Sequence, residues 1–556
     1  MQESAFRATP ASAQVAEEIS SSVVQPGSMV SPEIKTDSGR AAIDRVSIAC
    51  GLSLLSALLL ILSFPDFNLW PLAWIGFVPL LVVLARGQTP GRAFLLGWLA
   101  GSAFFYATCY WLTYSMIHYG GLRAWQAYLL IVPGALTCGL FPASFAFVLV
   151  RAMRRWGTGM LWLAPVLWVA FEYARLSVTG QLWNAIGYSQ AFHPALIQIA
   201  RYGGVYAAGF LIVTVNAAIA YALVQRTMRG LGRAALVIAG VLVVMLGSNG
   251  IRTISVRPVY RLPDLRIVAV QPNVPMDPVK SAEQLQELIT RHLVMSDDAL
   301  SALPHDGVPR LVIWPESPMN FSYGTDSQFR DLVGHFALDH HTAVLFNSQE
   351  PAPNDGFYNS ALLINEEGRA IAQYDKIRLM PFGEYVPLPQ WLPGSNQVRA
   401  IVGEFTPGTG YVLMPVGKVQ AGVFICIESA YPWIARRFTA EGADVLINIS
   451  NDGYLGQTAV MRQHLANAVF RAVENARPLL RVTNTGITAH IGPTGEVSDA
   501  SLGFGTTVKT WTVTREAQSQ TFYTRHGDLF AVSCATLTLF VFVLTFIRSN
   551  NFRSQI

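Results

Sequence analysis

Three polar residues in the second half of the chain have types that could together perform nucleophilic catalysis. Cys426 ends the apolar run AGVFIC, Glu316 follows the apolar run LVIWP, and Lys376 lies in the stretch YDKIRLMPFGEYVP. A thiol needs a base to form the thiolate, and a nearby cation lowers its pKa. Glu316, at the end of a predicted strand, is placed to act as that base. After attack on a carbonyl the oxyanion needs hydrogen-bond donors, which Lys376 and the backbone N–H of Ile427 could supply.

Each of these residues also has a purely structural interpretation. Buried free cysteines are common because the thiol behaves as a small hydrophobic group, and the stretch around Cys426 fits both interpretations equally. Glu316 could equally cap the following turn, and an isolated lysine such as Lys376 is better explained as part of a solvated loop. Lysine is rarely buried without a partner, and Glu384 lies eight residues further on as a candidate partner. The other four cysteines lie in long apolar runs, so Cys426 cannot form a disulfide within the polar half.

The elements that position these residues alternate between predicted strands and helices, which favours a layered α/β domain. Short runs rich in Val, Ile and Leu predict strands at 265–271, 311–314, 343–347, 359–364, 419–426, 444–449 and 479–483. Helical periodicity predicts helices at about 280–302, 326–340, 430–441 and 459–476. If the cysteine strand continues, Cys426 and Glu428 point to the same face of the sheet. The loop at 377–411 is long and rich in Pro and Gly, which is typical of a functional or disordered segment.

The composition is too apolar for an ordinary soluble protein of 556 residues. Hydrophobic residues make up 52% of the chain, charged residues only 13%, and the mean hydropathy is +0.36. Eight apolar runs approach the length of a spanning helix, about 20 residues, at about 46–64, 71–85, 93–114, 125–150, 159–177, 207–225, 233–248 and 529–547. The net charge is only +4, and no basic stretch with interleaved aromatic residues indicates nucleic-acid binding. Neither a metal-ligand spacing nor a complete nucleotide loop occurs in the sequence, so no cofactor is expected.

Arginine residues sort to one side of these predicted spans. Alternate connections and both flanks carry Arg40, Arg45, Arg86, Arg92, Arg151, Arg154, Arg155, Arg226, Arg229, Arg233, Arg548 and Arg553. By the positive-inside rule this side faces the cytoplasm. The predicted parts are a disordered cytoplasmic tail (1–44), a seven-span membrane domain (45–248), an outer-face domain (249–528) and a C-terminal spanning helix (529–547). In a Gram-negative cell this arrangement predicts an inner-membrane protein with its second domain in the periplasm.

Eight motifs spread over most of the chain carry a family resemblance. They are LWVAFEYAR (167–175), LWNAIGYSQ (182–190), QPNVP (271–275), WPES (314–317), DKIRLMPFGEYVP (375–387), CIE (426–428), SNDGYLG (450–456) and RQHLANAVFRAVENARPLLRVTNTG (462–486). The motifs of the polar half resemble the nitrilase, or carbon–nitrogen hydrolase, superfamily, whose catalytic residues are Glu, Lys and Cys in this chain order. Together with the apolar half they resemble the bacterial apolipoprotein N-acyltransferase family. The resemblance implies that Glu316 is the base, Lys376 the oxyanion stabiliser and Cys426 the nucleophile.

The same resemblance implies a four-layer α-β-β-α sandwich joined to a helical membrane bundle. It also implies an enzyme that moves an acyl chain, through a cysteine thioester, from a phospholipid to the N-terminal amine of a diacylglyceryl-cysteine lipoprotein, the final step of lipoprotein maturation. Glu384 and Glu428 would orient the lysine and the substrate. The expected partners are a phospholipid donor, a diacylated apolipoprotein acceptor and membrane lipid, with the enzyme as a monomer.

The sequence departs from the usual motifs at a few positions. They are Pro272, Lys280, Tyr454, Leu455 and Thr485. These positions, among which Tyr454 is a candidate substrate contact, lie in loops expected to meet lipid or acceptor. We therefore expect them to change acyl or acceptor preference rather than the chemistry.

Two other functions compete with this interpretation. One is a membrane-anchored amidase or nitrilase that releases its acyl group to water, and the other is a transporter or binding protein whose outer domain has lost catalysis. The presence of all three candidate residues, together with the lack of an evident inverted repeat in the apolar half, disfavours the second. Seven predicted spans before the outer domain are more than an anchor requires, which favours a lipid substrate over simple hydrolysis.

The predicted orientation can be tested by labelling single cysteines introduced into a background without native thiols. A thiol near Gly368 is expected to react with a membrane-impermeant reagent from the outer face, because the arginine bias places 249–528 there. A thiol introduced beside Arg154 serves as the control and should react only after the inner face is opened. Labelling of the first thiol only after that opening would contradict the orientation.

Overall fold

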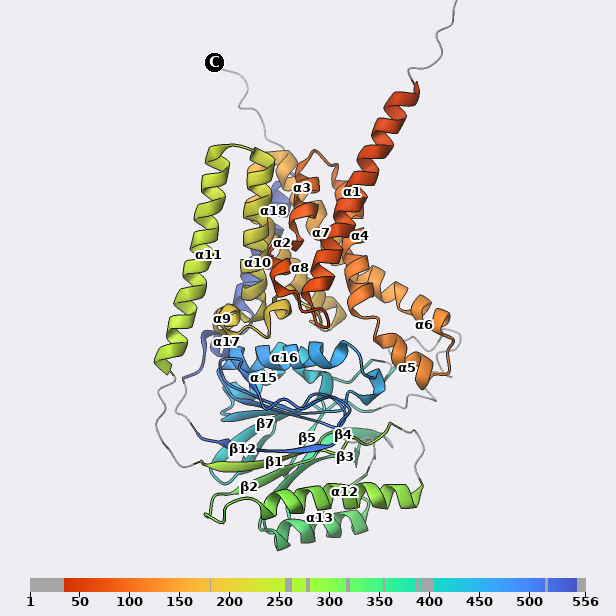
Figure 1. The fold of residues 1–556 in the computed structure, drawn as a ribbon, viewed down its shortest axis with the longest axis vertical. Helices are drawn as coiled ribbons and strands as arrows, with labels where there is room; N and C mark the ends of the chain where they lie inside the picture. Colours follow the sequence, from red (N-terminus) through yellow and green to blue (C-terminus); the bar gives the residue numbers. More distant parts are fainter. Residues whose placement is uncertain are drawn as a thin grey trace, which may run out of the picture. The chain divides into compact units, whose positions relative to one another are not determined.

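The computed structural model describes residues 35–180, 182–255, 263–276, 281–316, 321–353, 356–381, 383–386, 391, 405–515 and 519–547. Apolar helices come first along the chain, followed by two β-sheets that face each other and carry helices on their outer faces (Figure 1). Residues 48–556 form one compact unit that contains both the apolar helices and the sheets.

The eight predicted apolar runs all fold as helices. They form α1 (Lys35–Ser63), α2 (Ala73–Gly76), α3 (Val78–Ala85), α4 (Pro90–Thr108), α5 (Leu112–His118), α6 (Ala124–Leu130), α7 (Val132–Trp156), α8 (Ala164–Thr179), α10 (Ala200–Gln225), α11 (Met228–Ser255) and α18 (Leu529–Leu544). Short helical turns lie between them at η1 (Trp70–Leu72), η2 (Thr158–Leu163), η3 (Ile186–Gln190) and α9 (Pro194–Ile197).

Not every apolar helix is long enough to cross a membrane. Among the described residues, five helices are long and apolar enough: Val46–Ser63, Ala124–Trp156, Thr158–Thr179, Ala200–Gln225 and Met228–Asn249. The helices α4 and α5 meet at a bend of 50° and make a sixth if the pair counts as one span. The remaining two apolar segments, Trp70–Ala85 and α18, are shorter. The count of eight spans therefore stays a prediction.

Two segments predicted to lack regular structure are only partly described. Helix α1 already begins at Lys35, so the last part of the predicted disordered tail 1–44 is helical, and residues 1–34 lie outside the described residues. Much of the Pro- and Gly-rich loop at 377–411 also lies outside them.

The described residues of the second half contain two six-stranded sheets, in line with the predicted α/β sandwich. One sheet has the order β12-β1-β2-β3-β4-β5 and the other β11-β10-β9-β8-β7-β6. The strands are β1 (Leu265–Gln271), β2 (Arg310–Ile313), β3 (Ala343–Pro351), β4 (Phe357–Ile364), β5 (Ala370–Asp375), β6 (Leu413–Val416), β7 (Val419–Ile425), β8 (Val445–Ser450), β9 (Leu479–Thr483), β10 (Ala489–Ile491), β11 (Val497–Ser498) and β12 (Thr507–Val513). The flanking helices are α12 (Ala282–Ser301), α13 (Ser327–Asp339), α15 (Pro432–Ala440), α16 (Val460–Asn475) and α17 (Phe522–His526). The four layers α-β-β-α are visible in Figure 1.

Strand periodicity explains how the first sheet makes two cores. Successive side chains of a strand point to opposite faces. Ile267 and Leu345 therefore pack in the large core shared with the second sheet, while their neighbours Val268 and Val344 pack in a separate core with α12 and α13. Both faces of these strands are buried, which is why the sequence shows continuous apolar runs rather than alternation.

Helix α16 lies between the second sheet and the apolar helices (Figure 1). All of its residues except Arg462 are buried, because β9 covers one side and α10 the other. Arg471 and Glu474 of this helix form an ion pair of 2.8 Å with no exposed surface on either side chain. Glu474 also accepts a hydrogen bond of 2.9 Å from the backbone N–H of Val205, at the kink in α10, so the pair joins the two halves of the protein.

The buried pair predicts a large effect of removing its cation. Arg471→Met leaves the Glu474 carboxylate buried without its cation, and breaking a buried pair in this way typically costs about 3–5 kcal/mol. We expect a clear fall in the thermal unfolding temperature of the detergent-solubilised protein. The matched control is Arg437→Met, because the Arg437–Glu441 pair is exposed and such pairs contribute at most about 1 kcal/mol. The double variant Arg471→Met, Glu474→Leu should recover part of the loss, and equal effects of the two single arginine variants would contradict the interpretation.

Candidate active site

The three candidate catalytic residues come directly after strands that end at the same edge of the sandwich. Strands β1, β2 and β3 are parallel, and β5 runs the same way because it is separated from β3 by one antiparallel strand. In the second sheet β7 and β8 are parallel. Glu316 follows β2, Lys376 follows β5 and Cys426 follows β7. The carboxyl ends of parallel strands commonly form the ligand site of open α/β sheets, and here they gather the three side chains.

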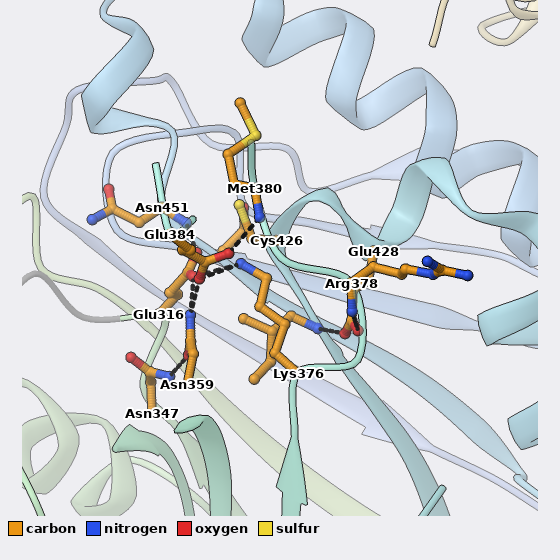
Figure 2. A network of polar contacts seen from close by, with 12 residues as sticks. Glu316, Asn347, Asn359, Lys376, Arg378, Met380, Glu384, Cys426, Glu428 and Asn451 are labelled. Atoms are coloured by element: carbon orange, nitrogen blue, oxygen red, sulfur yellow. Dashed lines mark hydrogen bonds and ion pairs between the residues drawn. The ribbon is translucent and has the colours of Figure 1, made fainter. Parts of the chain in front are cut away.

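Lys376 lies between two carboxylates. Its ammonium donates hydrogen bonds of 3.3 Å to Oε1 of Glu316 and 2.9 Å to Oε1 of Glu384. The side-chain amide of Asn359 donates to the same two oxygens, at 3.0 Å and 2.6 Å (Figure 2). The lysine is only 1% exposed, so the solvated-loop interpretation of this residue is wrong. Glu384 is the partner that its spacing from the lysine predicted.

Backbone amides hold the other oxygen of each carboxylate. Oε2 of Glu316 accepts from the N–H of Asn451 at 3.1 Å, and Oε2 of Glu384 accepts from the N–H of Met380 at 2.6 Å. These bonds fix both carboxylates around one ammonium. Because hydrogen bonds to charged groups are worth more than neutral ones, these contacts stabilise the arrangement of the cluster.

Cys426 lies at a sharp change of backbone direction. Strand β7 ends at Ile425, and the 3-10 helix η5 (Cys426–Ala430) begins with Cys426 at φ +53°, in the left-handed region that non-glycine residues rarely adopt. The strand therefore does not continue, and the expectation that Cys426 and Glu428 share a sheet face is wrong. Figure 2 shows the sulfur of Cys426 on the side of Lys376 and Glu384, with Glu428 directed elsewhere.

Glu428 instead binds the backbone on the far side of the lysine. Its carboxylate accepts hydrogen bonds from the N–H groups of Ile377, Arg378 and Ile425, at 2.8, 3.0 and 2.8 Å, and from the hydroxyl of Tyr374. These contacts fasten the segment after β5 to the end of β7. Burial raises the pKa of Glu428 to about 7, against the effect of these N–H donors.

The electrostatics of the cluster keep the thiol protonated and the lysine charged at neutral pH. Burial and the nearby Glu316 carboxylate raise the pKa of Cys426, and the opposing effect of Lys376 is smaller. Burial disfavours the ammonium of Lys376, but Glu316 and Glu384 outweigh it and raise the lysine's pKa well above its usual value. A protonated thiol next to a buried carboxylate and a fixed ammonium suits attack with proton transfer to that carboxylate.

The other predicted site residues lie around this cluster. Ile427 follows Cys426 in the first turn of η5 and is buried. Tyr454 lies in η6 (Gly453–Leu455), is 53% exposed, and packs edge-on against Tyr119 of the apolar half, with ring centroids 5.6 Å apart. It does not join the hydrogen-bonded cluster. Lys280 lies outside the described residues.

Several polar residues of the site had no clear signal in the sequence. Asn359 lies inside a strand, and only its inward position would have distinguished it from other strand residues. The side-chain amide of Asn347 donates a hydrogen bond of 2.7 Å to Oδ1 of Asn359 and so orients the Asn359 side chain. Behind Cys426, His464 contacts both Asp452 and the carbonyl oxygen of Cys426, each at 2.9 Å. Residues so far apart in sequence come together only in the fold. No group of three or more His, Cys, Asp or Glu side chains among the described residues is placed to hold a metal ion.

Removal of the shared cation should make stability depend on pH in a defined direction. In Lys376→Met the carboxyl groups of Glu316 and Glu384 face each other without an ammonium, so one of them takes up a proton and its folded-state pKa rises above the unfolded value of about 4.3. Such a group contributes stability that is present below the unfolded pKa and lost as pH rises through the folded pKa. The difference in unfolding temperature between the variant and the wild type should therefore be larger at pH 8 than at pH 5.

Lys509→Met is the matched control because Lys509 pairs with Asp499 near the surface. Its unfolding temperature should stay close to that of the wild type at both pH values. A Lys376→Met difference that does not grow with pH would show that the lysine does not hold the two carboxylates in their charged forms.

The two halves of the chain match two different family models. Residues 56–218 match the model of the apolipoprotein N-acyltransferase N-terminal domain, and residues 266–521 match that of carbon-nitrogen hydrolase. Among solved structures, an amidase from Nesterenkonia sp. is 20% identical with a TM-score of 0.35 and covers 49% of this chain and 95% of its own. Nit3 of Saccharomyces cerevisiae, a member of branch 10 of the nitrilase superfamily, is 16% identical with a TM-score of 0.37 and covers 47% of this chain and 93% of its own.

Two curated relatives extend over nearly the whole chain. The apolipoprotein N-acyltransferase of Geobacter metallireducens is 34% identical over 518 residues, which cover 90% of this chain and 95% of the relative. The one from Bradyrhizobium diazoefficiens is 30% identical over 503 residues, 87% of this chain and 92% of the relative. Similarity at this level over both the apolar half and the sandwich means that the chain belongs to the apolipoprotein N-acyltransferase family.

Proposed function

We propose that this protein transfers an acyl chain from a phospholipid to the N-terminal amine of diacylglyceryl-cysteine apolipoproteins. The observation that carries the proposal is the cluster of the buried Glu316 and Lys376 with the half-buried Cys426 at the strand ends. This cluster lies next to α16, which packs against the apolar half. The activity named for the relatives, N-acylation of apolipoproteins, requires a group that accepts an acyl chain and a surface that meets lipid. The cluster is suited to the first need and the adjoining apolar helices to the second.

The first half-reaction acylates the enzyme. The thiol of Cys426 gives its proton to Glu316 as the sulfur attacks the ester carbonyl of the phospholipid. The oxyanion accepts hydrogen bonds from the ammonium of Lys376 and the N–H of Ile427, donors fixed before the charge develops. Collapse of the intermediate expels the glycerol oxygen, which takes the proton from Glu316. The products are a thioester at Cys426 and a lysophospholipid.

The second half-reaction transfers the acyl group. The neutral amine of the acceptor attacks the thioester carbonyl and gives a proton to Glu316, while the same donors hold the oxyanion. The thiolate then leaves and regains the proton from Glu316, so the enzyme returns to its starting state. In both halves Glu384 keeps Lys376 in place and Glu428 holds the backbone that follows it. No cofactor enters either step.

The proposal includes a place in the cell and a set of partners. Residues 45–248 and 529–547 form the membrane part, 249–528 form the periplasmic catalytic domain, and the protein lies in the inner membrane. The arginines of the apolar half gather in alternate connections between the predicted spans, which supports this orientation by the positive-inside rule. The partners are the phospholipid donor, the diacylated acceptor and the surrounding lipid, with one chain acting alone and no nucleic acid involved. Tyr454, which packs against Tyr119 of the apolar half, is the residue that we propose contacts lipid or acceptor.

A two-stage mass-spectrometry experiment tests the proposal. Enzyme incubated with phospholipid alone should gain the mass of one acyl chain on the peptide that contains Cys426, and Cys426→Ala should not. Addition of a diacylated lipopeptide with a free N-terminus should remove that mass and yield N-acylated peptide and lysophospholipid, because the amine attacks the thioester. A lipopeptide with an acetylated N-terminus is the control and should leave the adduct in place.

Two outcomes would contradict the proposal. An acyl adduct on a serine or lysine in place of Cys426 would show that the nucleophile is misassigned. Release of free fatty acid as fast without acceptor as with it would show that the protein is a hydrolase, the alternative that shares the same chemistry up to the thioester.

A further inference from the structure

The peptide group between Cys426 and Ile427 is held from behind by a histidine. Nε2–H of His464 donates to the carbonyl oxygen of Cys426 at 2.9 Å, and the side-chain amide of Asn448 donates to the same oxygen at 3.3 Å. A trans peptide is planar, so its C=O and N–H point in opposite directions. The two donors that fix the carbonyl of Cys426 therefore also fix the direction of the Ile427 N–H, away from α16.

This constraint matters because the peptide follows a strained residue. Cys426 has φ +53°, and a non-glycine residue keeps such a conformation only where its surroundings hold it. The N–H of Ile427 lies in the first turn of η5, where no intrahelical acceptor exists. The Ile427 N–H can therefore donate to a ligand, and its direction depends on the groups that hold the carbonyl of Cys426.

His464 is itself fixed by a buried ionic group. Its Nδ1 lies 2.9 Å from Oδ1 of Asp452, whose other oxygen accepts a bond of 2.9 Å from Arg481. Burial raises the pKa of Asp452, but Arg481 and His464 outweigh it and hold the value at about 2, so Asp452 is a carboxylate. Burial and Arg481 lower the pKa of His464. The carboxylate of Asp452 and the carbonyl oxygen of Cys426 oppose that shift because they favour the protonated ring. All three side chains are at most 4% exposed, so the ring has one fixed orientation.

The residue before His464 anchors the helix to the apolar half. The side-chain oxygen of Gln463 accepts bonds from the indole N–H groups of Trp111 and Trp183, at 3.0 and 2.8 Å. Its side-chain amide donates to the carbonyl oxygens of Pro65 and Thr108, at 3.2 and 3.1 Å. These four bonds use the full hydrogen-bonding capacity of a glutamine side chain. Three separate segments of the apolar half, around Pro65, residues 108–111 and Trp183, therefore meet at one residue of α16.

We propose that His464 is a positioning residue that orients the Ile427 N–H toward the oxyanion. We also propose that this orientation depends on the contacts of Gln463 with the apolar half. The inference rests on the proposed role of Cys426 as nucleophile. A donor displaced by a fraction of an ångström forms a weaker hydrogen bond to the oxyanion. This weakens mainly the stabilisation of the transition state, where the oxyanion charge is present. His464 therefore affects kcat, while substrate binding and the reactivity of the thiol itself are left in place.

His464→Gln tests the first part in the full-length protein. We expect kcat for lipopeptide acylation to fall about 10–10²-fold, within the range that small misplacements and lost oxyanion donors cause, with KM nearly unchanged. Iodoacetamide alkylation of Cys426, followed on its peptide by mass spectrometry, should stay near the wild-type rate because alkylation forms no oxyanion. The matched control is His292→Gln, since His292 is also buried on a helix but contacts Leu288 of its own helix and Trp314.

Gln463→Leu tests the link to the apolar half. It should lower kcat with KM and the alkylation rate preserved, the same pattern as His464→Gln. Gln198→Leu is its control, because Gln198 is equally buried and also joins the halves, through Thr494, but far along the chain from the cluster around Cys426. The control should keep the wild-type kcat.

Three results would overturn the inference. The first is a wild-type kcat in folded His464→Gln. The second is a fall in kcat of His464→Gln no greater than that of His292→Gln. The third is a fall in the rate of Cys426 alkylation in His464→Gln that parallels the fall in kcat. If His464→Gln does not accumulate as folded protein, Asn448→Ser replaces it, since Asn448 is the other donor to the same carbonyl, and a wild-type kcat there overturns the inference. Failure of the proposed function is distinguishable, because it appears as activity retained in Cys426→Ala.

Discussion

The site depends on one buried ammonium shared by two carboxylates. Removal of charged groups from water is expensive, and a buried charge persists only when close partners and additional hydrogen bonds compensate for lost hydration. Lys376 has Glu316 and Glu384 as those partners, and Asn359 donates to the same carboxylate oxygens. The remaining carboxylate oxygens are held by backbone N–H groups. Glu316 and Lys376 follow strands of the first sheet, whereas Asn451 follows β8 of the second. A shift of one sheet relative to the other would therefore remove the N–H that holds Oε2 of Glu316.

The positions of the strands and of the candidate triad were largely predictable from the sequence. Strands buried on both faces appear as uninterrupted apolar runs, and the chemistry-bearing residues stand out directly after them. The strands that had no such signal are short or lie at sheet edges: β5, β6, β10, β11 and β12. In β5, for example, most side chains are exposed or half-buried, so the sequence AIAQYD lacks a continuous apolar run. The sandwich was thus predictable in class but not in the number of its strands.

The direction of side chains at the site was less predictable, because it depends on one backbone torsion. A single residue with positive φ, Cys426, ends strand β7 and turns Glu428 away from the sulfur. No pattern of residue types reports such a torsion in a non-glycine residue. The contacts of Asn359, and those of His464 with Asp452, also depend on long-range packing. His464 stands next to Gln463 in a helical pattern, and nothing in that pattern shows that it contacts the carbonyl of the candidate nucleophile.

Helix α16 shows why so many polar residues can lie in a helix that is buried except at Arg462. A helix between two apolar layers would normally carry apolar residues all round. Here polar side chains face both layers and find partners in each: Gln463 in the apolar half, His464 at the carbonyl of Cys426, and Arg471 with Glu474 near the kink of α10. Because an unpaired buried polar group is costly, these contacts require a specific register between the sandwich and the apolar helices. One of these contacts, that of His464, also holds the carbonyl group of Cys426. The docking of the sandwich on the apolar helices and the backbone geometry at the candidate nucleophile therefore both depend on α16.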